Sequence, residues 1–468
     1  MRHFDLIVIG TGPAGQKAAI QAAKLGKQVA IVEKNEVVGG VCLHTGTIPS
    51  KALREAVLEL TGRRSQAGFD RMLRKVTIDD LVFWSNRVIR TEMEVIRNQM
   101  YRNGVELLYG VASFDGDSHR IEITRQHSDE KLTADHFVIA TGTQPCRHPD
   151  LPYDDVDVVD SDGILKLGGL PRSMIIVGGG VIGTEYACIL ALLGVRLTLV
   201  EARDTLLEFA DREIVEALQY HMRQIGITLR LGESVEKVEI LDGGSVPGTR
   251  KGIVRATLQS GKHLKADTLM YCIGRQGATR ALGLDGIGVA IDSRGRIKVN
   301  EHYQSEIPHI YAVGDVIGFP ALASTAMEQG RLAACHMFGA PTHSMPELFP
   351  YGIYSIPEIS MVGRNEKQLT DEGIPYEAGI ARYKEIARGQ LLGDEIGMLK
   401  LLVHQDTREL LGVHSIGTGA TELIHIGQAC MALGGTVDFF INNVFNYPTL
   451  AEAYKIAALN ASNRLAFG

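Results

Sequence analysis

The stretch LIVIGTGPAG, residues 6–15, decides the fold of this chain. Its four apolar residues are typical of a β-strand, and Gly10, Gly12 and Gly15 follow them with GxGxxG spacing. In such a motif the first glycine allows a tight turn from strand to helix. The second lets the backbone approach a pyrophosphate, and the third lets the helix pack closely on the strand. Free N–H groups at the start of the next helix favour phosphate. The stretch therefore predicts a dinucleotide-binding β-α-β unit.

The pattern occurs a second time, as MIIVGGGVIG at residues 174–183. After each motif come a helix-compatible run and a second apolar strand, which ends on Glu33 in the first case and on Glu201 in the second. Each acid stands 23 residues after the first glycine of its motif, at 33 after 10 and at 201 after 178. A carboxylate near this distance can accept the hydroxyls of an adenosine ribose. One motif alone would fit a structural loop as well, but two complete copies predict two bound dinucleotides. The second set of glycines is Gly178, Gly180 and Gly183.

Composition sets the class of protein. The 468 residues have room for roughly three domains. A net charge of −7 argues against a nucleic-acid or anionic-membrane partner. Six cysteines are scattered without a CxxC pair or a Cys/His cluster, so we expect no metal site and a reducing compartment. The first residues lack signal-peptide features, and the apolar run at 181–195 contains Glu185 and is too short to span a membrane. We expect a soluble, cytoplasmic protein.

The stretch GGVCLHTGTIPSK, residues 39–51, leads on from the first acid. It contains Gly39, Gly40 and one thiol, Cys42, and five residues later comes Thr47. A hydroxyl can neither form a disulfide nor leave as a thiolate, so dithiol exchange cannot run between these two positions. Another cysteine would have to be brought close by folding.

Two further strand ends carry polar residues. HFVIATGTQP, residues 136–145, reads as a strand that ends at Thr141 and Gly142. HIYAVGDVIGFPALAS, residues 309–324, reads as a strand followed by Asp315 and then a helix. From the residues alone, Asp315 fits a helix N-cap better than a ligand of a polyol such as the ribityl chain of a flavin.

The order of these motifs, with YCIGRQGAT at 271–279 and YPTLAEAY at 447–454, resembles the flavoprotein disulfide reductases over nearly the whole chain. The resemblance implies an α/β protein with two Rossmann-like domains and a C-terminal α+β dimerisation domain. It implies FAD in the first site and a nicotinamide nucleotide in the second, with Ala323 and Gly274 among the cofactor contacts, and a homodimer. The implied domains are 1–150 with 273–343 for FAD, 151–272 for NAD(P), and 344–468 for dimerisation.

Two departures from that family occur together. The family's C-x4-C dithiol is replaced by Cys42 and Thr47. Its H-P-T-x-x-E acid–base motif keeps the acid, Glu452, but has Tyr447 where the histidine stands. A phenol titrates near pH ~10 and is a poor base at neutral pH. Because the resolving thiol and its proton shuttle are both replaced, we infer a reaction that uses neither.

The family's cation beside the flavin is retained. By resemblance, Lys51 and Glu185 form an ion pair next to flavin N5, where hydride arrives, and a cation there favours the negative charge of reduced flavin. Taken by itself, Glu185 would read as a solvated or first-turn carboxylate. The matched pair favours the catalytic interpretation.

Both departures, and the segments at 46–57, 311–324, 352–360 and 445–454, resemble the soluble transhydrogenase subfamily. That resemblance implies a Si-specific, FAD-dependent transfer of hydride between NADPH and NAD⁺, one nucleotide after the other. A dehydrogenase that passes electrons to a quinone or dye would use the same residues. A third possibility is a flavoprotein that acts without catalysis in a larger complex.

The ribose end of the second site carries both charges. Glu201 favours a ribose hydroxyl and Arg203 can pair with a 2′-phosphate, as an enzyme that accepts NAD(H) and NADP(H) requires. Equally, Arg203 can be a surface charge paired with Asp204 or Glu208. We assign no chemistry to His44, and for His425 and Glu422 we expect core or interface packing. A break in helical structure is expected at residues 63–70.

Overall fold

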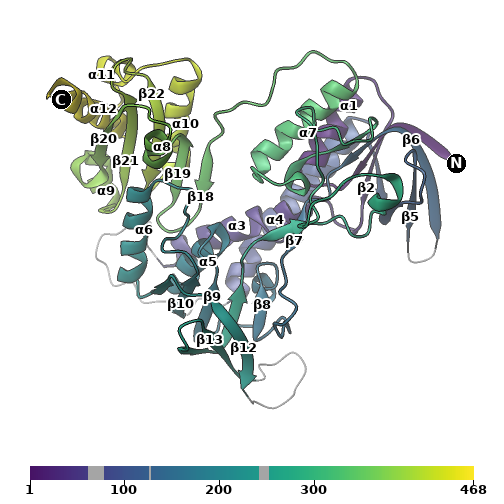
Figure 1. The fold of residues 1–468 in the computed structure, drawn as a ribbon, viewed down its shortest axis with the longest axis horizontal. Coiled ribbons are helices and arrows are strands. Elements are labelled where there is room, and N and C mark those ends of the chain that lie inside the picture. The colour runs from purple at the N-terminus through teal and green to yellow at the C-terminus, as the bar shows by residue number, and fades with distance from the viewer. Residues whose placement is uncertain (62–77, 126–127, 242–251, 468) are drawn as a thin grey trace. The chain divides into compact units, whose positions relative to one another are not determined.

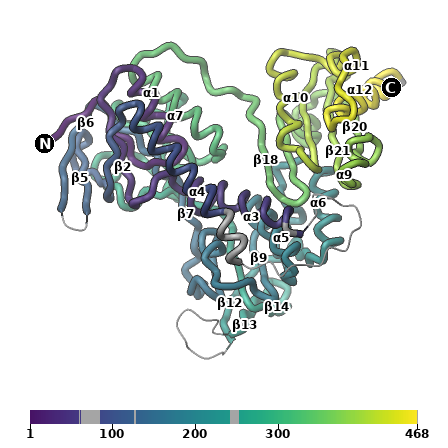
Figure 2. Tube along the Cα trace, turned by 180° about the vertical axis from the view of Figure 1, so that it is seen from behind, coloured from purple at the N-terminus to yellow at the C-terminus, as the bar shows by residue number. Residues whose placement is uncertain are grey.

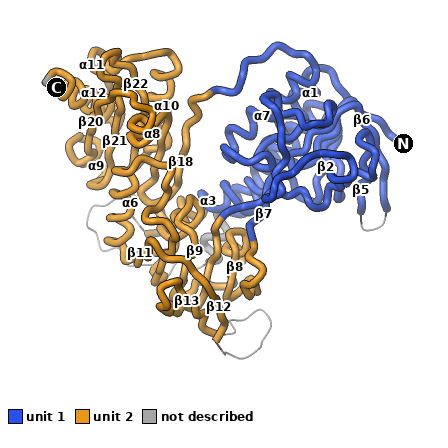
Figure 3. Tube along the Cα trace, viewed as in Figure 1, with its two compact units in different colours: residues 1–52, 82–146, 274–346 blue, residues 53–81, 147–273, 347–468 orange. Residues whose placement is uncertain are grey.

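The fold is described from a computed structural model, which describes residues 1–61, 78–125, 128–241 and 252–467 (Figure 1). The chain divides into two compact units (Figure 3). The first unit comprises residues 1–52, 82–146 and 274–346, and the second comprises 53–81, 147–273 and 347–468. The break in helical structure expected at residues 63–70 lies outside the described residues. The boundaries of the three implied domains remain a prediction.

A seven-stranded sheet forms the centre of the first unit. Its parallel part has the order β3-β2-β1-β6, with β17 added beside β6, and β5 and β4 continue it antiparallel. Within the parallel part, β2 and β17 are buried throughout and β1 is buried over most of its length, as expected for parallel strands covered on both faces. The strands are β1 (Arg2–Ile9), β2 (Val29–Glu33), β3 (Glu106–Tyr109), β4 (Val111–Phe114), β5 (Arg120–Thr124), β6 (Asp129–Ile139) and β17 (Ile310–Ala312).

Two helices of the first unit, α1 (Pro13–Lys24) and α7 (Ala323–Met337), lie side by side in both views (Figures 1 and 2). They approach so closely that a Cβ at Gly330 would lie 2.1 Å from the carbonyl oxygen of Ala14. The glycine is therefore needed for this contact. The remaining elements of this unit are α2 (Gly40–His44), β7 (Thr143–Pro145), β16 (Arg275–Gly277), η2 (Leu284–Ile287) and η3 (Gly314–Ile317). By sequence, α3 (Thr47–Leu60) and α4 (Ile78–Arg102) belong partly to each unit.

A second parallel sheet, with the order β11-β10-β9-β15-β8, forms the first half of the second unit. A three-stranded antiparallel sheet, β12-β13-β14, accompanies it. The elements are β8 (Val158–Asp160), η1 (Ile164–Lys166), β9 (Ser173–Val177), α5 (Val181–Leu192), β10 (Arg196–Glu201), α6 (Arg212–Gln224), β11 (Thr228–Leu231), β12 (Val235–Leu241), β13 (Ile253–Leu258), β14 (His263–Ala266) and β15 (Thr268–Tyr271).

An antiparallel sheet with the order β18-β19-β22-β21-β20 forms the C-terminal part of the second unit. Helices α10 and α12 pack on it, and Tyr383, Tyr454 and Phe440 fill its core. The elements are β18 (Tyr351–Ile353), β19 (Ile359–Gly363), α8 (Glu366–Asp371), β20 (Tyr376–Arg382), η4 (Tyr383–Glu385), α9 (Ala387–Leu392), β21 (Met398–His404), β22 (Leu410–Ile416), α10 (Ala420–Ala432), α11 (Asp438–Asn442) and α12 (Glu452–Phe467).

This architecture confirms the predicted α/β class, with two dinucleotide-binding folds followed by an α+β C-terminal part. Among the described helices, none combines the length and apolar character needed to cross a bilayer.

Candidate functional site

The first glycine turn joins β1 to α1. Gly10 has a φ of +109°, and a Cβ there would lie 2.4 Å from the carbonyl oxygen of Ala140. A Cβ at Gly15 would lie 2.0 Å from the carbonyl oxygen of Gly10. Gly12, the N-cap of α1, differs, since beyond its own chain neighbours no atom of the described residues lies within 4 Å of its Cβ position. The protein itself thus requires the outer two glycines, and the middle one faces space that a ligand can fill.

The second glycine turn repeats this geometry between β9 and α5. Gly178 has a φ of +113°, and a Cβ there would lie 2.7 Å from the carbonyl oxygen of Cys272. A Cβ at Gly183 would lie 1.9 Å from the carbonyl oxygen of Gly178. Gly180 is the N-cap of α5 and again meets nothing within 4 Å in the described residues. The two turns therefore offer equivalent openings at helix N-termini.

The two acids lie beside the two turns. Glu33, at the end of β2, accepts hydrogen bonds on Oε2 from the backbone N (3.2 Å) and Oγ1 (2.5 Å) of Thr11. Glu201, at the end of β10, accepts one on Oε2 from Gly179 N at 2.6 Å. Thr11 and Gly179 hold the same place, between the first and second glycine of each motif. Both carboxylates are buried, so each is fixed where an adenosine ribose would lie.

The loop that opens residues 39–51 covers the first turn. Gly39 N donates to Thr11 Oγ1 at 3.0 Å, and a Cβ at Gly40 would lie 3.1 Å from Gly12 Cα. Both glycines have positive φ values, +112° and +60°. This close approach places α2, and with it Cys42, next to the first dinucleotide turn.

Cys42 is a protonated thiol at neutral pH. Burial raises the pKa of Cys42 and the Asp315 carboxylate raises it further, while a hydrogen bond with Thr47 and the charge of Lys51 act in the opposite direction. All six cysteines of the chain are free thiols. A thiolate is the reactive form, so this site lacks both the second sulfur and the nucleophile of a dithiol centre. In the described residues no group of His, Cys, Asp and Glu is arranged to hold a metal ion.

Asp315 and Thr141 are the other polar groups of the first unit that the sequence analysis singled out. Asp315 lies in η3 and is not a helix N-cap; Val313 and Leu322 hold the N-cap positions of η3 and α7. The N-cap interpretation is therefore wrong. Burial raises the pKa of Asp315, and the Arg275 guanidinium partly offsets this. Thr141 follows the carboxyl end of β6, and its Oγ1 is buried without a hydrogen-bond partner in the part of the chain that the structure describes.

These groups fit an FAD molecule. The Oγ1 atoms of Thr141 and Thr45 are both buried without a hydrogen-bond partner in the described residues, so a bound ligand can supply one. Gly12 leaves open space at a helix N-terminus. Asp315 lies close enough to Cys42 to influence its thiol, so the polar groups and the 39–51 loop share one region. Of the remaining predicted contacts, Ala323 is the first residue of α7, Gly142 accepts a hydrogen bond from Ala278 N at 3.0 Å, and Gly274 accepts one from Cys146 N at 3.1 Å.

Arg203 is directed at Glu201. Its Nε lies 2.8 Å from Glu201 Oε1 and its Nη2 lies 3.1 Å from Oε2, with Glu208 a third contact at 3.4 Å. Burial opposes the charge of Glu201, yet the hydrogen bonds from Arg203 and Gly179 hold the pKa of this carboxyl below its usual value. Of the two surface partners expected for Arg203, Glu208 is a third contact. The principal partner of Arg203 is Glu201. The acid and the base of the ribose end form one unit.

Two family models match this chain along most of its length. Pyridine nucleotide-disulphide oxidoreductase matches residues 4–330, and the dimerisation domain of the same family matches residues 349–458. The chain belongs to this family. Flavoprotein disulfide reductases with this architecture bind FAD and a pyridine nucleotide, which the two turns of this chain can accommodate.

Relatives of the family agree with the assignment. A soluble pyridine nucleotide transhydrogenase of Mycobacterium tuberculosis (strain ATCC 25177 / H37Ra) is 53% identical over 99% of this chain and 98% of its own length. One from Vibrio parahaemolyticus is 46% identical over 99% of both chains. Among solved structures, the HOCl-induced flavoprotein disulfide reductase RclA from Escherichia coli superposes with a TM-score of 0.86 at 25% identity, covering 97% of this chain and 99% of its own.

The family's lysine and glutamate lie in different units of the structure. Glu185 in α5 is 3% exposed and accepts a hydrogen bond on Oε1 from Tyr354 N at 2.8 Å, so it is not a solvated carboxylate. Lys51 is in α3, and its charge influences Cys42. The Lys51–Glu185 pair remains a prediction.

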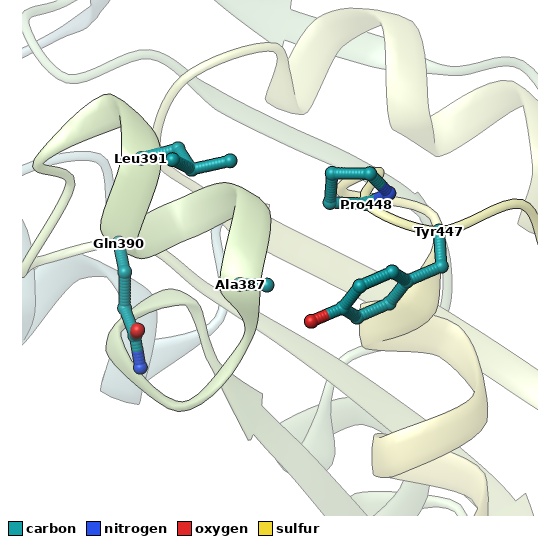
Figure 4. Close-up of a pocket in the computed structure, with 5 residues that line it drawn as sticks. All are labelled: Ala387, Gln390, Leu391, Tyr447 and Pro448. Carbon is teal, nitrogen blue, oxygen red and sulfur yellow. The ribbon is translucent and has the colours of Figure 1, made fainter.

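The residue in place of the family's histidine is exposed. Tyr447 adjoins a cavity of about 410 Å³, and its phenol points toward Ala387 of α9 (Figure 4).

His425 and Glu422 are exposed on α10, which excludes core packing for both and leaves interface packing as a prediction. His44 Nε2 lies 2.8 Å from the carbonyl oxygen of Val38, so it is tied to the loop backbone.

Three functional contacts were missed from the sequence. Thr11 could have been found, since it stands between two glycines of the motif. Gln329, whose side-chain oxygen accepts from Gly314 N at 2.8 Å, and Tyr354, whose N–H binds Glu185, carry no local signal. Tyr354 lies 169 residues from Glu185 in the chain, whereas Gln329 lies 15 residues after Gly314.

Cys42→Ser should leave the protein yellow and its turnover within about threefold of the unmodified protein, because the thiol is protonated and has no second sulfur to work with. Turnover and flavin absorbance per chain measure this. Cys146→Ser, at another partly buried thiol of the first unit, is the matched control. Complete loss of turnover in Cys42→Ser with FAD still bound would show that the thiol takes part in the reaction.

Proposed function

We propose that this chain is an FAD-dependent, Si-specific NAD(P)⁺ transhydrogenase, which catalyses NADPH + NAD⁺ ⇌ NADP⁺ + NADH. The observation that carries the proposal is the pairing of Cys42 with Thr47 instead of a second thiol, beside an intact dinucleotide turn. Without a disulfide to reduce, a second nucleotide is the acceptor that the site can accommodate. The relatives' name, soluble pyridine nucleotide transhydrogenase, supports the same reaction.

In the first site, we assign the binding of FAD to groups already fixed by the fold. Glu33 would hold the adenosine ribose, the N-terminus of α1 the pyrophosphate, and Asp315 the ribityl hydroxyls. When bound, FAD would supply hydride acceptance and return at N5. Lys51 contributes a cation that favours negative charge on the reduced ring system, and Glu185 would orient that cation.

In the second site, we assign alternating binding of NAD(H) and NADP(H). Glu201 accepts the 2′-hydroxyl of the unphosphorylated nucleotide. Arg203, held at 2.8 Å from Glu201 Oε1, can turn to a 2′-phosphate when NADP(H) binds. Since the carboxylate and the guanidinium neutralise each other, neither nucleotide is rejected by an unbalanced charge, and one site can serve both.

Glu201→Ala should raise the KM for NAD⁺ about tenfold and change the KM for NADPH little or lower it, since a ribose hydroxyl loses a charged acceptor while Arg203 becomes free for phosphate. Steady-state kinetics with each nucleotide varied in turn measure this. Glu216→Ala, at an exposed acid of α6 paired with Arg212, is the control. Equal changes in both KM values would remove Glu201 as the selector.

We also propose that the protein is a cytoplasmic homodimer. The C-terminal domain matches a dimerisation domain and exposes large apolar side chains, among them Leu433, Val444 and Tyr447. Apolar side chains of this size are typical of surfaces that are covered in an oligomer. Six free thiols are in keeping with a reducing compartment. Sedimentation equilibrium should give twice the chain mass of 50.9 kDa.

The transhydrogenase proposal is tested by mixing the purified yellow protein with NADPH and thio-NAD⁺ without any quinone. Formation of thio-NADH is the expected result. Bleaching of the flavin by NADPH under nitrogen without thio-NADH formation would replace the proposal with a quinone or dye reductase. A flavin that NADPH does not bleach would indicate a non-catalytic flavoprotein.

A further inference from the structure

The segment between β10 and α6, residues 202–211, follows directly on Glu201 and is called the ribose loop below. It contains Arg203, and it ends on Asp211, the N-cap of α6. One side of the loop is built against the second glycine turn. Leu207 N donates to the carbonyl oxygen of Gly179 at 3.1 Å, and the buried Leu206 packs against Gly179.

The other side of the ribose loop is held by the C-terminal domain. Lys400 Nζ of β21 lies 3.1 Å from Asp211 Oδ1. Asn365 Nδ2, at the N-cap of α8, donates to the carbonyl oxygen of Phe209 at 3.2 Å. The Phe209 ring meets the Tyr351 ring edge-on, with centroids 5.1 Å apart. Three different kinds of contact thus connect one short loop to the C-terminal domain.

Lys400 is a fully buried cation. Its side chain has 0% exposure, and besides Asp211 it contacts Glu366 at 2.7 Å and Glu213 at 3.2 Å. Burial opposes its charge, but the carboxylates of Asp211 and Glu366 outweigh this and raise the pKa of Lys400. A buried ion of this kind is fixed in place, because moving it away from its partners would leave charges unpaired.

The ribose loop also holds a backbone conformation that it would not adopt alone. Leu207 has a φ of +44°, in the left-handed region that non-glycine residues rarely occupy. Such conformations persist where the surroundings fix them from several sides. Here Gly179 fixes the loop from one side, and Asn365 and Lys400 fix it from the other.

We propose that Lys400 and Asn365 are positioning residues for nucleotide choice: the C-terminal domain holds the ribose loop in the geometry in which Glu201 and Arg203 distinguish a 2′-hydroxyl from a 2′-phosphate. The inference rests on the proposed role of Glu201 and Arg203 at the ribose. Neither Lys400 nor Asn365 is proposed to touch the nucleotide. Their effect is therefore expected in the ratio of affinities for phosphorylated and unphosphorylated ligands.

The test uses the full-length holoprotein and two adenosine fragments, adenosine 2′,5′-bisphosphate and 5′-AMP, which differ only in the 2′-phosphate, so that the ratio of their affinities reports on the ribose end. Dissociation constants are measured by calorimetry. In Lys400→Met we expect the affinity ratio of the two fragments to change by roughly fivefold, through weaker binding of the bisphosphate, whose 2′-phosphate depends on the placement of Arg203. FAD content and the rate of flavin reduction at saturating NADPH should stay near those of the unmodified protein.

Two further variants keep the test independent of folding. Lys400→Met/Asp211→Asn removes the buried cation together with its one fully buried carboxylate and retains an N-cap oxygen. The Glu366 and Glu213 carboxylates that also contact Lys400 are each 38% exposed and can be solvated. Asn365→Asp retains the capping oxygen of α8, loses the donor to Phe209 and places a carboxylate oxygen against that carbonyl. Both should change the ratio in the same direction. Arg408→Met, which breaks the Arg408–Asp438 pair elsewhere in the same domain, should not change it.

Glu201→Ala distinguishes a failure of the positioning role from a failure of the proposed ribose site. If Glu201→Ala changes the ratio and the Lys400 and Asn365 variants do not, the positioning role is wrong and the proposed ribose site stands. If Glu201→Ala itself leaves the ratio unchanged, the ribose site is elsewhere and the inference falls with it. A change in Arg408→Met equal to that in Lys400→Met would show general loosening of the domain and would also overturn the proposal.

Discussion

Gly183→Ala should abolish reduction of the bound flavin by NADPH, and Gly180→Ala should weaken it strongly while the fold stays intact. A methyl group at position 183 would lie 1.9 Å from the carbonyl oxygen of Gly178 and 3.0 Å from Cys272 Sγ. The turn would have to open, at about 1–3 kcal/mol of stability for this kind of overpacking. A methyl group at position 180 meets nothing in the described chain, so only a ligand would be displaced.

The measurements are thermal unfolding, flavin absorbance and bleaching by NADPH under nitrogen. Gly180→Ala should unfold at the usual temperature and bind NADPH at least about tenfold more weakly, since the pyrophosphate loses close backbone contact. Gly183→Ala should unfold earlier and remain unbleached. Gly12→Ala should give a colourless protein, because the first turn is assigned to FAD. Gly168→Ala, at a glycine in open space, is the control. Normal NADPH binding in Gly180→Ala would exclude the second turn as the pyrophosphate site.

The glycine turns could be predicted from the sequence because all their determinants are local. The strand, the three glycines, the helix and the acid lie within about thirty residues, the length of a β-α-β unit. Steric demands at Gly10 and Gly15 fix the residue type directly, so the pattern and the geometry agree closely. The same locality explains why Glu33 and Glu201 were placed correctly beside their turns.

The contacts that complete the sites could not be predicted, because they join distant segments. Lys400 lies in the apolar stretch MLKLLVH, and nothing in that stretch indicates a partner for its charge. Every residue of that strand up to Val403 is buried, since both faces of β21 are covered, and so the usual alternation is absent. Whether Lys400 met solvent or Asp211 depended on tertiary packing alone. For Arg203 the sequence allowed several partners, and it could not show that the buried carboxylate of Glu201 would be the principal one.

Lys51→Met should slow hydride transfer by about 100- to 1,000-fold while FAD and NADPH still bind, the range found when one preorganised electrostatic group is removed from a transition state. Methionine keeps the length and apolar stem of lysine and removes the charge. Stopped-flow reduction of the flavin by NADPH measures the step directly. Lys51→Arg retains a cation and should recover part of the rate. Lys131→Met, which removes an exposed cation of the same unit, is the control.

A second readout tests the placement of Lys51 without reference to activity. The Lys51 charge lowers the pKa of the partly buried Cys42 thiol, in opposition to burial and to Asp315. In Lys51→Met the Cys42 thiolate should therefore appear at higher pH, and alkylation of the Cys42 peptide, followed by mass spectrometry, should shift in that direction. A shift in alkylation without slower flavin reduction would place Lys51 in the site and remove it from catalysis. Slower reduction with unchanged alkylation would mean that the lysine acts from a position other than the one beside Cys42.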